Sequence, residues 1–205
     1  ADNLEPADVA ALADAGLTAQ HAAAKAAKRL RPGDFCVVIG AGGLGHIGIQ
    51  VMKAMSAATL VVLDSNPAAL ALAKELGADE TILSDGSQVD AVLDLTEGKG
   101  AEAILDFVGE GGATSEGIAM LRRAGFYYVI GYGENINVPT IDVISTEKNF
   151  IGNLVGSYTD LQDLMVLAAQ GKVKLHTQQY KLADFQQAID DLNAVKVRGR
   201  AILIP

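Results

Sequence analysis

The 205-residue sequence is poor in the residues that mark several protein classes: it has no tryptophan, five prolines and one cysteine. The single cysteine, Cys36, cannot form a disulfide within the chain, which excludes a disulfide scaffold and predicts a reducing, cytoplasmic location. No apolar run approaches the roughly 20 residues that a membrane-spanning helix needs, and residues 1–6 lack the pattern of a secretory leader. We therefore expect no membrane partner.

Positive charge is also scarce. The chain has 16 Lys and Arg against 25 Asp and Glu, a net charge of −9, which argues against nucleic acid and anionic lipid as partners. Apolar residues make up 50% of the chain, enough for a sizeable core in one domain with appendages. The composition thus predicts a globular fold that binds neither nucleic acid nor membrane.

A glycine-rich turn is the most informative feature that is present. The apolar run 35–39 stops at Gly40, and Gly40, Gly42 and Gly45 supply the G-x-G-x-x-G spacing of a dinucleotide site. The first glycine allows a sharp turn out of the strand, the second allows close approach of a pyrophosphate, and the third allows tight packing of the next helix on its strand. The pyrophosphate would lie on free N–H groups where that helix starts.

An acidic residue stands where a dinucleotide site needs one. A second apolar run, 59–63, ends in Asp64, which lies 24 positions after Gly40. An acid there accepts hydrogen bonds from the adenosine ribose hydroxyls and repels a 2′-phosphate. Since residues 65–67 contain no arginine to bind such a phosphate, the pattern predicts NAD rather than NADP. The alternative is a tight strand–helix turn in which Asp64 is only a cap.

Apolar strands alternate with helices along the chain. This alternation predicts an α/β fold: a doubly wound, parallel, six-stranded sheet of the Rossmann type, with helices on both faces. We expect a lead-in segment at 1–16, an NAD-binding domain at 17–156, and C-terminal helices with a returning strand at 157–205. The expected strands are 35–39, 59–63, 80–83, 103–108, 125–131, 149–155 and 201–204, and the expected helices are 17–30, 44–55, 67–77, 88–96, 113–122, 161–168 and 185–192.

Five short motifs extend over nearly the whole chain: DAGLTA at 14–19, RPGD at 31–34, VIGAGGLGHIG at 38–48, LGAD at 76–79 and VRGR at 197–200. Together they resemble the medium-chain zinc-dependent alcohol dehydrogenases, and among them the bacterial NAD-dependent secondary-alcohol type. The resemblance implies an NAD(H)-binding coenzyme domain of an oxidoreductase. It also implies that the catalytic domain, which comes first in that family, is missing here, so the chain would be a shortened or separately produced coenzyme domain.

The resemblance assigns cofactor contacts to particular positions. Asp64 is the implied ribose acceptor, and Arg200 matches an arginine that reaches the pyrophosphate, although a surface arginine that ends a helix–strand turn is an equal alternative. Ala69 departs from the family, which often has Lys or Arg beside the ribose there. The remaining implied contacts are Gly40, Gly42, Gly43 and Leu44 around the pyrophosphate, and Thr18, Val108, Ile130, Gly131, Asn153 and Val155 around the nicotinamide.

The resemblance implies little zinc chemistry for this chain alone. The family's catalytic zinc is held by a cysteine and a Gly-His-Glu histidine from the preceding domain, and the chain has no Gly-His-Glu. Asp14 stands where the family can place a third ligand, but we favour a solvated acid near a helix start. Tetrahedral zinc needs three or four protein ligands, and the histidines show no ligand spacing. We expect His46 to be a helix-start residue beside the cofactor.

Three functions remain open at this stage. The first is a coenzyme domain with little or no alcohol oxidation of its own. The second is an active NAD-dependent oxidoreductase that acts on secondary alcohols or ketones. The third is an NAD-sensing regulatory module, against which the motifs at 31–34 and 197–200 argue. The absence of Tyr-x-x-x-Lys excludes a short-chain reductase.

Two of the predicted strands have no evident partner within the chain. The sixth strand, 149–155, would be an apolar edge, and because unpaired edges are a liability we expect a homodimer through it. The final strand, 201–204, joins the catalytic domain's sheet in the family that the chain resembles. We therefore expect 201–204 either to repack or to be poorly ordered.

Overall fold

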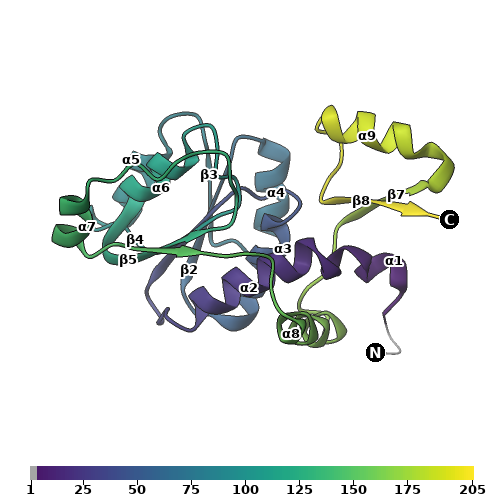
Figure 1. Cartoon of the computed structure of the whole chain (residues 1–205), viewed down its shortest axis with the longest axis horizontal. Coiled ribbons are helices and arrows are strands. Elements are labelled where there is room, and N and C mark those ends of the chain that lie inside the picture. The colour runs from purple at the N-terminus through teal and green to yellow at the C-terminus, as the bar shows by residue number, and fades with distance from the viewer. Residues whose placement is uncertain (1–3) are drawn as a thin grey trace.

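The computed structural model describes residues 4–205, so the first three residues of the expected lead-in lie outside the description. Its centre is a parallel six-stranded sheet in the order β3-β2-β1-β4-β5-β6 (Figure 1). The order reverses between β1 and β4, which is the switch point where ligands bind in such sheets. The predicted fold class is confirmed. The strands are β1 (Phe35–Ile39), β2 (Thr59–Asp64), β3 (Glu80–Leu83), β4 (Ala101–Asp106), β5 (Leu121–Val129) and β6 (Asn149–Gly152).

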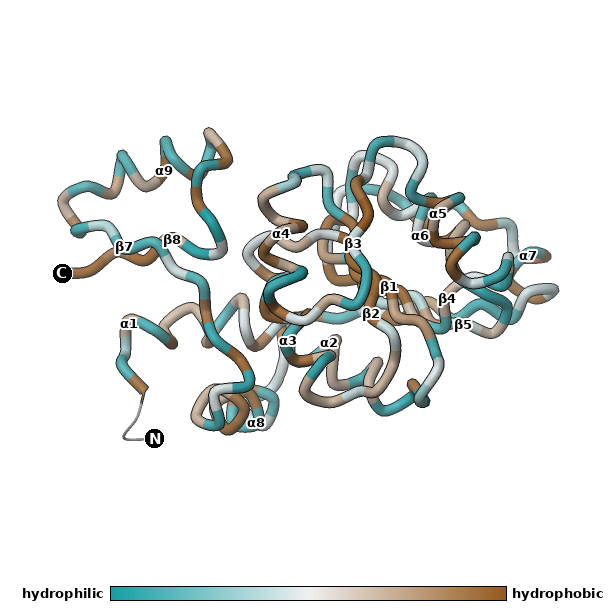
Figure 2. The backbone as a smooth tube through the Cα atoms, turned by 180° about the vertical axis from the view of Figure 1, so that it is seen from behind, coloured by the Kyte–Doolittle hydropathy of each residue, from teal (hydrophilic) through white to brown (hydrophobic). Residues whose placement is uncertain are grey.

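Helices cover both faces of this sheet, as the alternation predicts. Cys36 and Val38 of β1 belong to a core shared with one set of helices, whereas Val37 and Ile39 belong to a second core on the opposite face. Because successive strand residues point to opposite faces, an unbroken apolar strand contributes to both cores. Figure 2 shows the central strands β1 and β2 largely in the brown of hydrophobic residues. The first set is α2 (Ala15–Ala27), α3 (Gly45–Met55), α4 (Pro67–Glu75) and α8 (Tyr158–Ala169), and the second is α5 (Gln88–Leu95) and α6 (Ala113–Met120).

Local sequence chemistry fixes the ends of α4, which borders the candidate site. The Asn66 side chain accepts a hydrogen bond from the N–H of Ala68, and Pro67 occupies the first helical position. Gly77, with φ +102°, follows the last turn in a conformation that favours glycine. The helix thus starts where the sequence predicts and ends at Glu75, two residues before the expected end.

Several boundaries differ from the prediction. β5 begins at Leu121, four residues early, because Leu121 already pairs with Ala101 of β4. β6 ends at Gly152, and Val155 lies beyond it with φ +47°, a left-handed conformation that no strand continues through. Four short helical elements were not predicted individually, because each is too short to show a clear apolar periodicity: α1 (Pro6–Val9), η1 (Ala10–Ala13), α7 (Thr140–Thr146) and η2 (Leu182–Asp184).

The C-terminal residues form a small separate layer. β7 (Thr177–Lys181) and β8 (Arg200–Ile204) pair in parallel, joined by η2 (Leu182–Asp184) and α9 (Phe185–Asn193), and Figure 1 shows them to the right of α4 and above α1. The returning strand is therefore ordered and paired with a strand that the polar sequence TQQYK did not predict. Among residues 4–205, no helix is long and apolar enough to cross a membrane.

Candidate functional site

The glycine-rich turn between β1 and α3 forms the centre of the candidate site. Gly40 has φ +89°, and a Cβ there would lie 2.7 Å from Cγ2 of Val108. A Cβ at Gly45 would overlap the carbonyl oxygen of Gly40, so only glycine lets α3 start this close to β1. Gly42 has no atom within 4 Å of its Cβ position, which leaves space above the turn. The three glycines therefore have the geometry that the motif predicts.

Asp64 lies beside this turn, at the carboxyl end of β2. Its Oδ2 accepts a hydrogen bond from the N–H of Ala41 at 2.7 Å, and its Oδ1 accepts one from the N–H of Asn66 at 2.8 Å. Asp64 is half-buried, and each carboxylate oxygen keeps further acceptor capacity. The carboxylate is thus held at the glycine turn and is still able to bind a hydroxyl.

Two cavities meet at Asp64. The first, of about 340 Å³, lies between the ends of β1, β2 and β4, and its lining includes Ser84 and Val108. The second, of about 420 Å³, lies between the glycine turn, the start of α4 and the C-terminal segment 195–199. A ligand that occupies both would cross the glycine turn between them, as an extended dinucleotide does.

A buried carboxylate organises the neighbouring strand ends. Asp106, at the end of β4, is 1% exposed, and its Oδ1 accepts hydrogen bonds from the N–H groups of Val108 and Gly109, each at 2.9 Å. Its Oδ2 accepts one from the Tyr127 hydroxyl at 2.6 Å. Burial, with the neighbouring Asp106, raises the pKa of Tyr127, so this hydroxyl stays a donor. The main-chain oxygen of Asp106 accepts from the N–H groups of Ile130 and Gly131.

A histidine from the start of α3 and an arginine from β8 lie at the glycine turn. His46 is fully buried, and its Nδ1 lies 2.9 Å from the carbonyl oxygen of Gly42. Burial lowers the pKa of His46 to about 4, so the ring is neutral at neutral pH. Arg200, the first residue of β8, places its Nη1 2.9 Å from the position that a Cβ of Gly43 would occupy. Arg200 is therefore at the turn rather than out on the surface.

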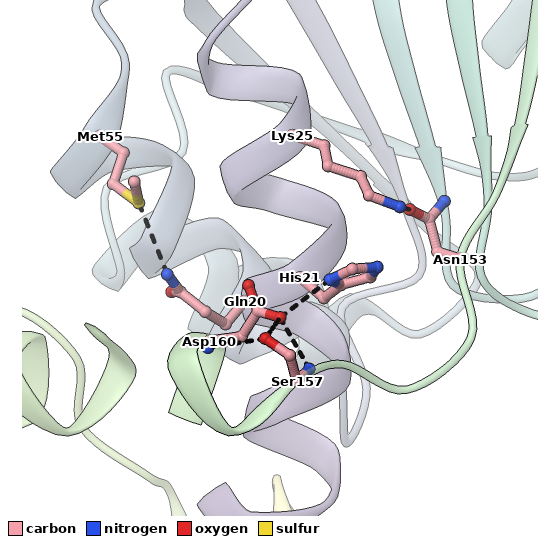
Figure 3. A network of polar contacts seen from close by, with 7 residues as sticks. All are labelled: Gln20, His21, Lys25, Met55, Asn153, Ser157 and Asp160. Carbon is pink, nitrogen blue, oxygen red and sulfur yellow. Dashed lines mark hydrogen bonds and ion pairs between the residues drawn. The ribbon is translucent and has the colours of Figure 1, made fainter. Parts of the chain in front are cut away.

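A polar network holds the segment after β6 against α2 (Figure 3). Lys25 Nζ donates to Oδ1 of Asn153 at 3.0 Å, and Asn153 Nδ2 donates to the carbonyl oxygens of Val129 and Ile151. His21 Nδ1 lies 3.0 Å from Oδ2 of Asp160 in the first turn of α8. The Asn153 side chain thus links β5 and β6 to α2, and only the backbone of Asn153 is available to contact a ligand.

Most of the predicted contacts lie along one edge of the sheet. Parts of the glycine turn, Asp64 and Val108 line the two cavities, Arg200 lies against Gly43, and Ile130 and Gly131 are joined to this edge through Asp106. Thr18 is in the first turn of α2, where its Oγ1 donates to the carbonyl oxygen of Asp14. Val155 lies in the exposed segment after β6.

Zinc does not fit the residues that the structure describes. Asp14 is exposed at the N-cap of α2, and within residues 4–205 no group of three or more His, Cys, Asp or Glu side chains is placed to hold a metal ion. His46 is a helix-start residue, as expected.

Sequence reasoning missed Asp106 and Tyr127 as parts of the site. The signal for Asp106 was only partial, because the acid interrupts the apolar run but Phe107 and Val108 continue it, so the strand was predicted to extend to 108, whereas β4 ends at Asp106. Its partner could not be found in the same way. Tyr127 lies inside the next strand, and only the parallel register of β4 and β5 brings the two side chains together.

Comparison with known proteins is consistent with this geometry. A family model described as "Zinc-binding dehydrogenase" matches residues 43–170. An NAD-dependent alcohol dehydrogenase from Sulfurisphaera tokodaii is 37% identical over 206 residues, which cover 98% of this chain and 59% of that protein. D-arabinose 1-dehydrogenase (NADP(+)) from Saccharolobus solfataricus is 31% identical over 211 residues, which cover 100% of this chain and 59% of that protein.

A solved structure shows the same arrangement of elements. The crystal structure of the alcohol dehydrogenase from the archaeon Aeropyrum pernix matches with a TM-score of 0.93 at 42% identity, covering 97% of this chain and 58% of that one. The chain therefore spans about three fifths of the length of the relatives it matches.

Proposed function

Because the chain belongs to the zinc-binding dehydrogenase family, we propose that it binds NAD(H) as the coenzyme-binding part of an alcohol dehydrogenase. One observation carries the proposal. The Asp64 carboxylate is hydrogen-bonded to the glycine turn at Ala41, and the two cavities meet there. A carboxylate and a row of free N–H groups side by side suit a ribose joined to a pyrophosphate.

Each part of the proposed site has its own task. The glycine turn and the first N–H groups of α3 hold the pyrophosphate, with Arg200 as its counter-charge. Asp64 accepts hydrogen bonds from the adenosine ribose. Val108, Ile130 and Gly131, fixed by Asp106, line the nicotinamide side, together with Thr18 and the backbone at Asn153 and Val155. When bound, the nicotinamide supplies the hydride acceptor or donor of an oxidoreductase reaction.

We also propose a preference for NAD over NADP. A 2′-phosphate would meet the Asp64 carboxylate, and like charges at short range repel. No cation follows Asp64 in the sequence, and the two cations that line the second cavity, Lys196 and Arg198, are paired with Asp191 and Glu75. The NADP(+)-dependent relative shows that the family contains both specificities, so the residue at position 64 is the one to test.

The substrate of the whole protein is proposed from its relatives. Two of the similar proteins are named alcohol dehydrogenases, which supports a small alcohol, or the matching ketone, as substrate.

The division proposed for this chain is a lead-in at 1–16, the NAD-binding domain at 17–156, and C-terminal helices with the returning strand at 157–205.

The proposed partner is a second copy of the chain, paired through residues 149–155. β6 is the outer strand of the sheet, and large apolar side chains are exposed next to it: Leu154 is 88% exposed and Tyr158 is 77% exposed. Exposed apolar surface beside an open strand edge supports a subunit contact.

A cytoplasmic location is also proposed, and it rests on the single thiol, Cys36, which is buried and unpaired.

A fluorescence titration tests the proposed function. Purified chain is titrated with NADH, and with NADPH in parallel, while nicotinamide emission is followed. We expect saturable binding of NADH and binding of NADPH weaker by about tenfold or more, because the 2′-phosphate would lie beside the like-charged Asp64 carboxylate; tenfold corresponds to about 1.4 kcal/mol. Equal binding of the two nucleotides would contradict the role of Asp64, and binding of neither would contradict the proposed function.

A further inference from the structure

Gln50 fastens the C-terminal part of the chain to α3. Its side chain is 6% exposed, its Nε2 donates to the carbonyl oxygen of Lys174 at 2.9 Å, and its Oε1 accepts from the N–H of Lys174 at 2.8 Å. One amide thus pairs with both main-chain groups of one residue, as a neighbouring strand would. The same Nε2 also donates to the carbonyl oxygen of His46, one turn earlier on α3.

His46 makes a second link in the same direction. A carbonyl oxygen only accepts, so the Nδ1 that faces Gly42 carries the proton, and Nε2 is left as an acceptor. Nε2 faces the N–H of His176 at 3.4 Å, and the two rings lie edge to face with centroids 6.0 Å apart. The buried neutral ring therefore lies between the glycine turn and the residue that precedes β7.

His176 in turn places Arg200. The N–H of Arg200 donates to the carbonyl oxygen of His176 at 2.9 Å. Gly199, with φ +83°, lets the chain pass close by, because a Cβ there would overlap that same oxygen. From this point the Arg200 side chain extends to Gly43 in the glycine turn. The residue before it, Gly42, is the one whose carbonyl oxygen is hydrogen-bonded to His46. These contacts therefore form a closed loop, which leads from the glycine turn to His46, His176 and Arg200 and back to the glycine turn.

We infer that His46 and Gln50 are positioning residues for Arg200: they hold segment 174–176 on α3 and thereby set the guanidinium over the pyrophosphate turn. The inference rests on the proposed function in one respect, namely that the ligand of Arg200 is a pyrophosphate. Arg200 belongs to the two-stranded sheet, which shares no strand with the six-stranded sheet, so its place at the turn depends on contacts between the two layers, of which the Arg198–Glu75 ion pair is another.

A double-mutant cycle separates positioning from general stability. Arg200→Met removes the guanidinium and should weaken NADH binding about tenfold or more, as expected for loss of a charge-assisted hydrogen bond. Gln50→Leu should weaken NADH binding about fivefold or more through the displaced arginine. In the Gln50→Leu background, Arg200→Met should then cost less than about twofold, because the two changes act on one contact. Gln162→Leu, at an exposed glutamine of α8, is the matched control and should change nothing.

Adenosine, which lacks the pyrophosphate, is the second probe. Its binding should be equal in all four proteins, since Asp64 and its cavities are untouched. Losses from Gln50→Leu and Arg200→Met that multiply in the double variant would overturn the inference. Equal loss of adenosine and NADH binding in Gln50→Leu would overturn it too, because the damage would then be general.

Amide hydrogen exchange tests the fastening without any nucleotide. In Gln50→Leu and in His46→Asn, the amides of Lys174, His176 and Arg200 should exchange at least about tenfold faster than in the parent chain, with the amides of β1 unchanged. Unchanged protection at His176 and Arg200 would overturn the inference even if the parent chain bound no NADH. Conversely, absent NADH binding together with this faster exchange would count against the proposed function alone.

Discussion

At the scale of single residues, Asp64 combines a structural contact with a proposed binding task. Asp64→Asn keeps the size of the side chain but removes the charge, and a hydrogen bond to a charged group is worth about 1.5–3 kcal/mol. We expect NADH affinity to fall about tenfold or more and the preference over NADPH to shrink, as measured by the fluorescence titration. Asp94→Asn, at an exposed acid of α5, is the control. Unaltered preference in Asp64→Asn would contradict the account.

Asp106 and Tyr127 make a second prediction at this scale. Tyr127→Phe removes one of the three hydrogen bonds to the buried carboxylate, and Asp106→Ala leaves two N–H donors and the hydroxyl without a partner. We expect the free energy of unfolding in urea to fall by about 2 kcal/mol for the first and about 3 kcal/mol or more for the second. The double variant should be no less stable than Asp106→Ala, since both changes break one network.

The neighbouring tyrosine provides the control for this pair. Tyr128 is equally buried, but its hydroxyl contacts the carbonyl oxygen of Lys25 at the long distance of 3.4 Å. Tyr128→Phe should therefore cost less than about 1 kcal/mol. Equal losses for Tyr127→Phe and Tyr128→Phe would mean that the Asp106 carboxylate needs no hydroxyl donor.

At the scale of elements, the start of α3 makes stability depend on pH through His46. Its pKa is lowered from 6.5 to about 4, mainly by burial and further by His176 and Arg200, while hydrogen bonds to Gly42 and Gly43 oppose the shift. Between these values the unfolded chain binds more protons, so stability is full above about pH 6.5 and falls as the pH drops to about 4. The loss is on the order of 3 kcal/mol.

The His46→Asn variant isolates this effect from other groups that titrate in the same range. Asparagine is able to donate to the carbonyl oxygen of Gly42 but takes up no proton. Urea unfolding of both proteins at about pH 7 and about pH 4.5 should show a smaller loss of stability for the variant. The same pH slope in both would show that His46 does not remain neutral in the folded chain.

The elements also show how far sequence reasoning extends. Strands that are apolar on both faces, such as β1, and helices with explicit caps, such as α4 after Asn66, were predicted because the signal is local. β7 was not, since its residues Thr177–Lys181 are polar and its pairing with β8 is a contact between distant segments. The limits of β5 were wrong for the same reason, because pairing of Leu121 with Ala101 extends the strand.

In the candidate site, too, the residues marked by a local sequence pattern were predicted, and those that depend on contacts between distant segments were not. The glycine turn and Asp64 follow from spacing alone, and they lie together as predicted. Asp106 with Tyr127, and Gln50 with Lys174, join side chains to partners that only the folded chain brings close. Asn153 was predicted to contribute its backbone, and the contact of its side chain with Lys25, 128 residues earlier in the chain, is likewise one that only the folded chain brings about.

At the scale of the whole molecule, the open edge at β6 predicts a dimer. Light scattering should give the mass of two chains. Leu154→Lys should shift the equilibrium to the mass of one, because a charge replaces an exposed apolar side chain beside the edge strand. Leu182→Lys, at a 56% exposed leucine between β7 and α9, should leave the mass unchanged. A parent chain with the mass of one would contradict the proposed pairing.

The central claim is that one edge of the sheet binds a dinucleotide, and amide NMR during a titration with NADH tests it most directly. The account predicts that the largest shift changes fall on residues 41–45, Asp64 and residues 108–109, with residues 185–193 of α9 unchanged. Saturable changes confined to other residues, or none at the glycine turn, would contradict it.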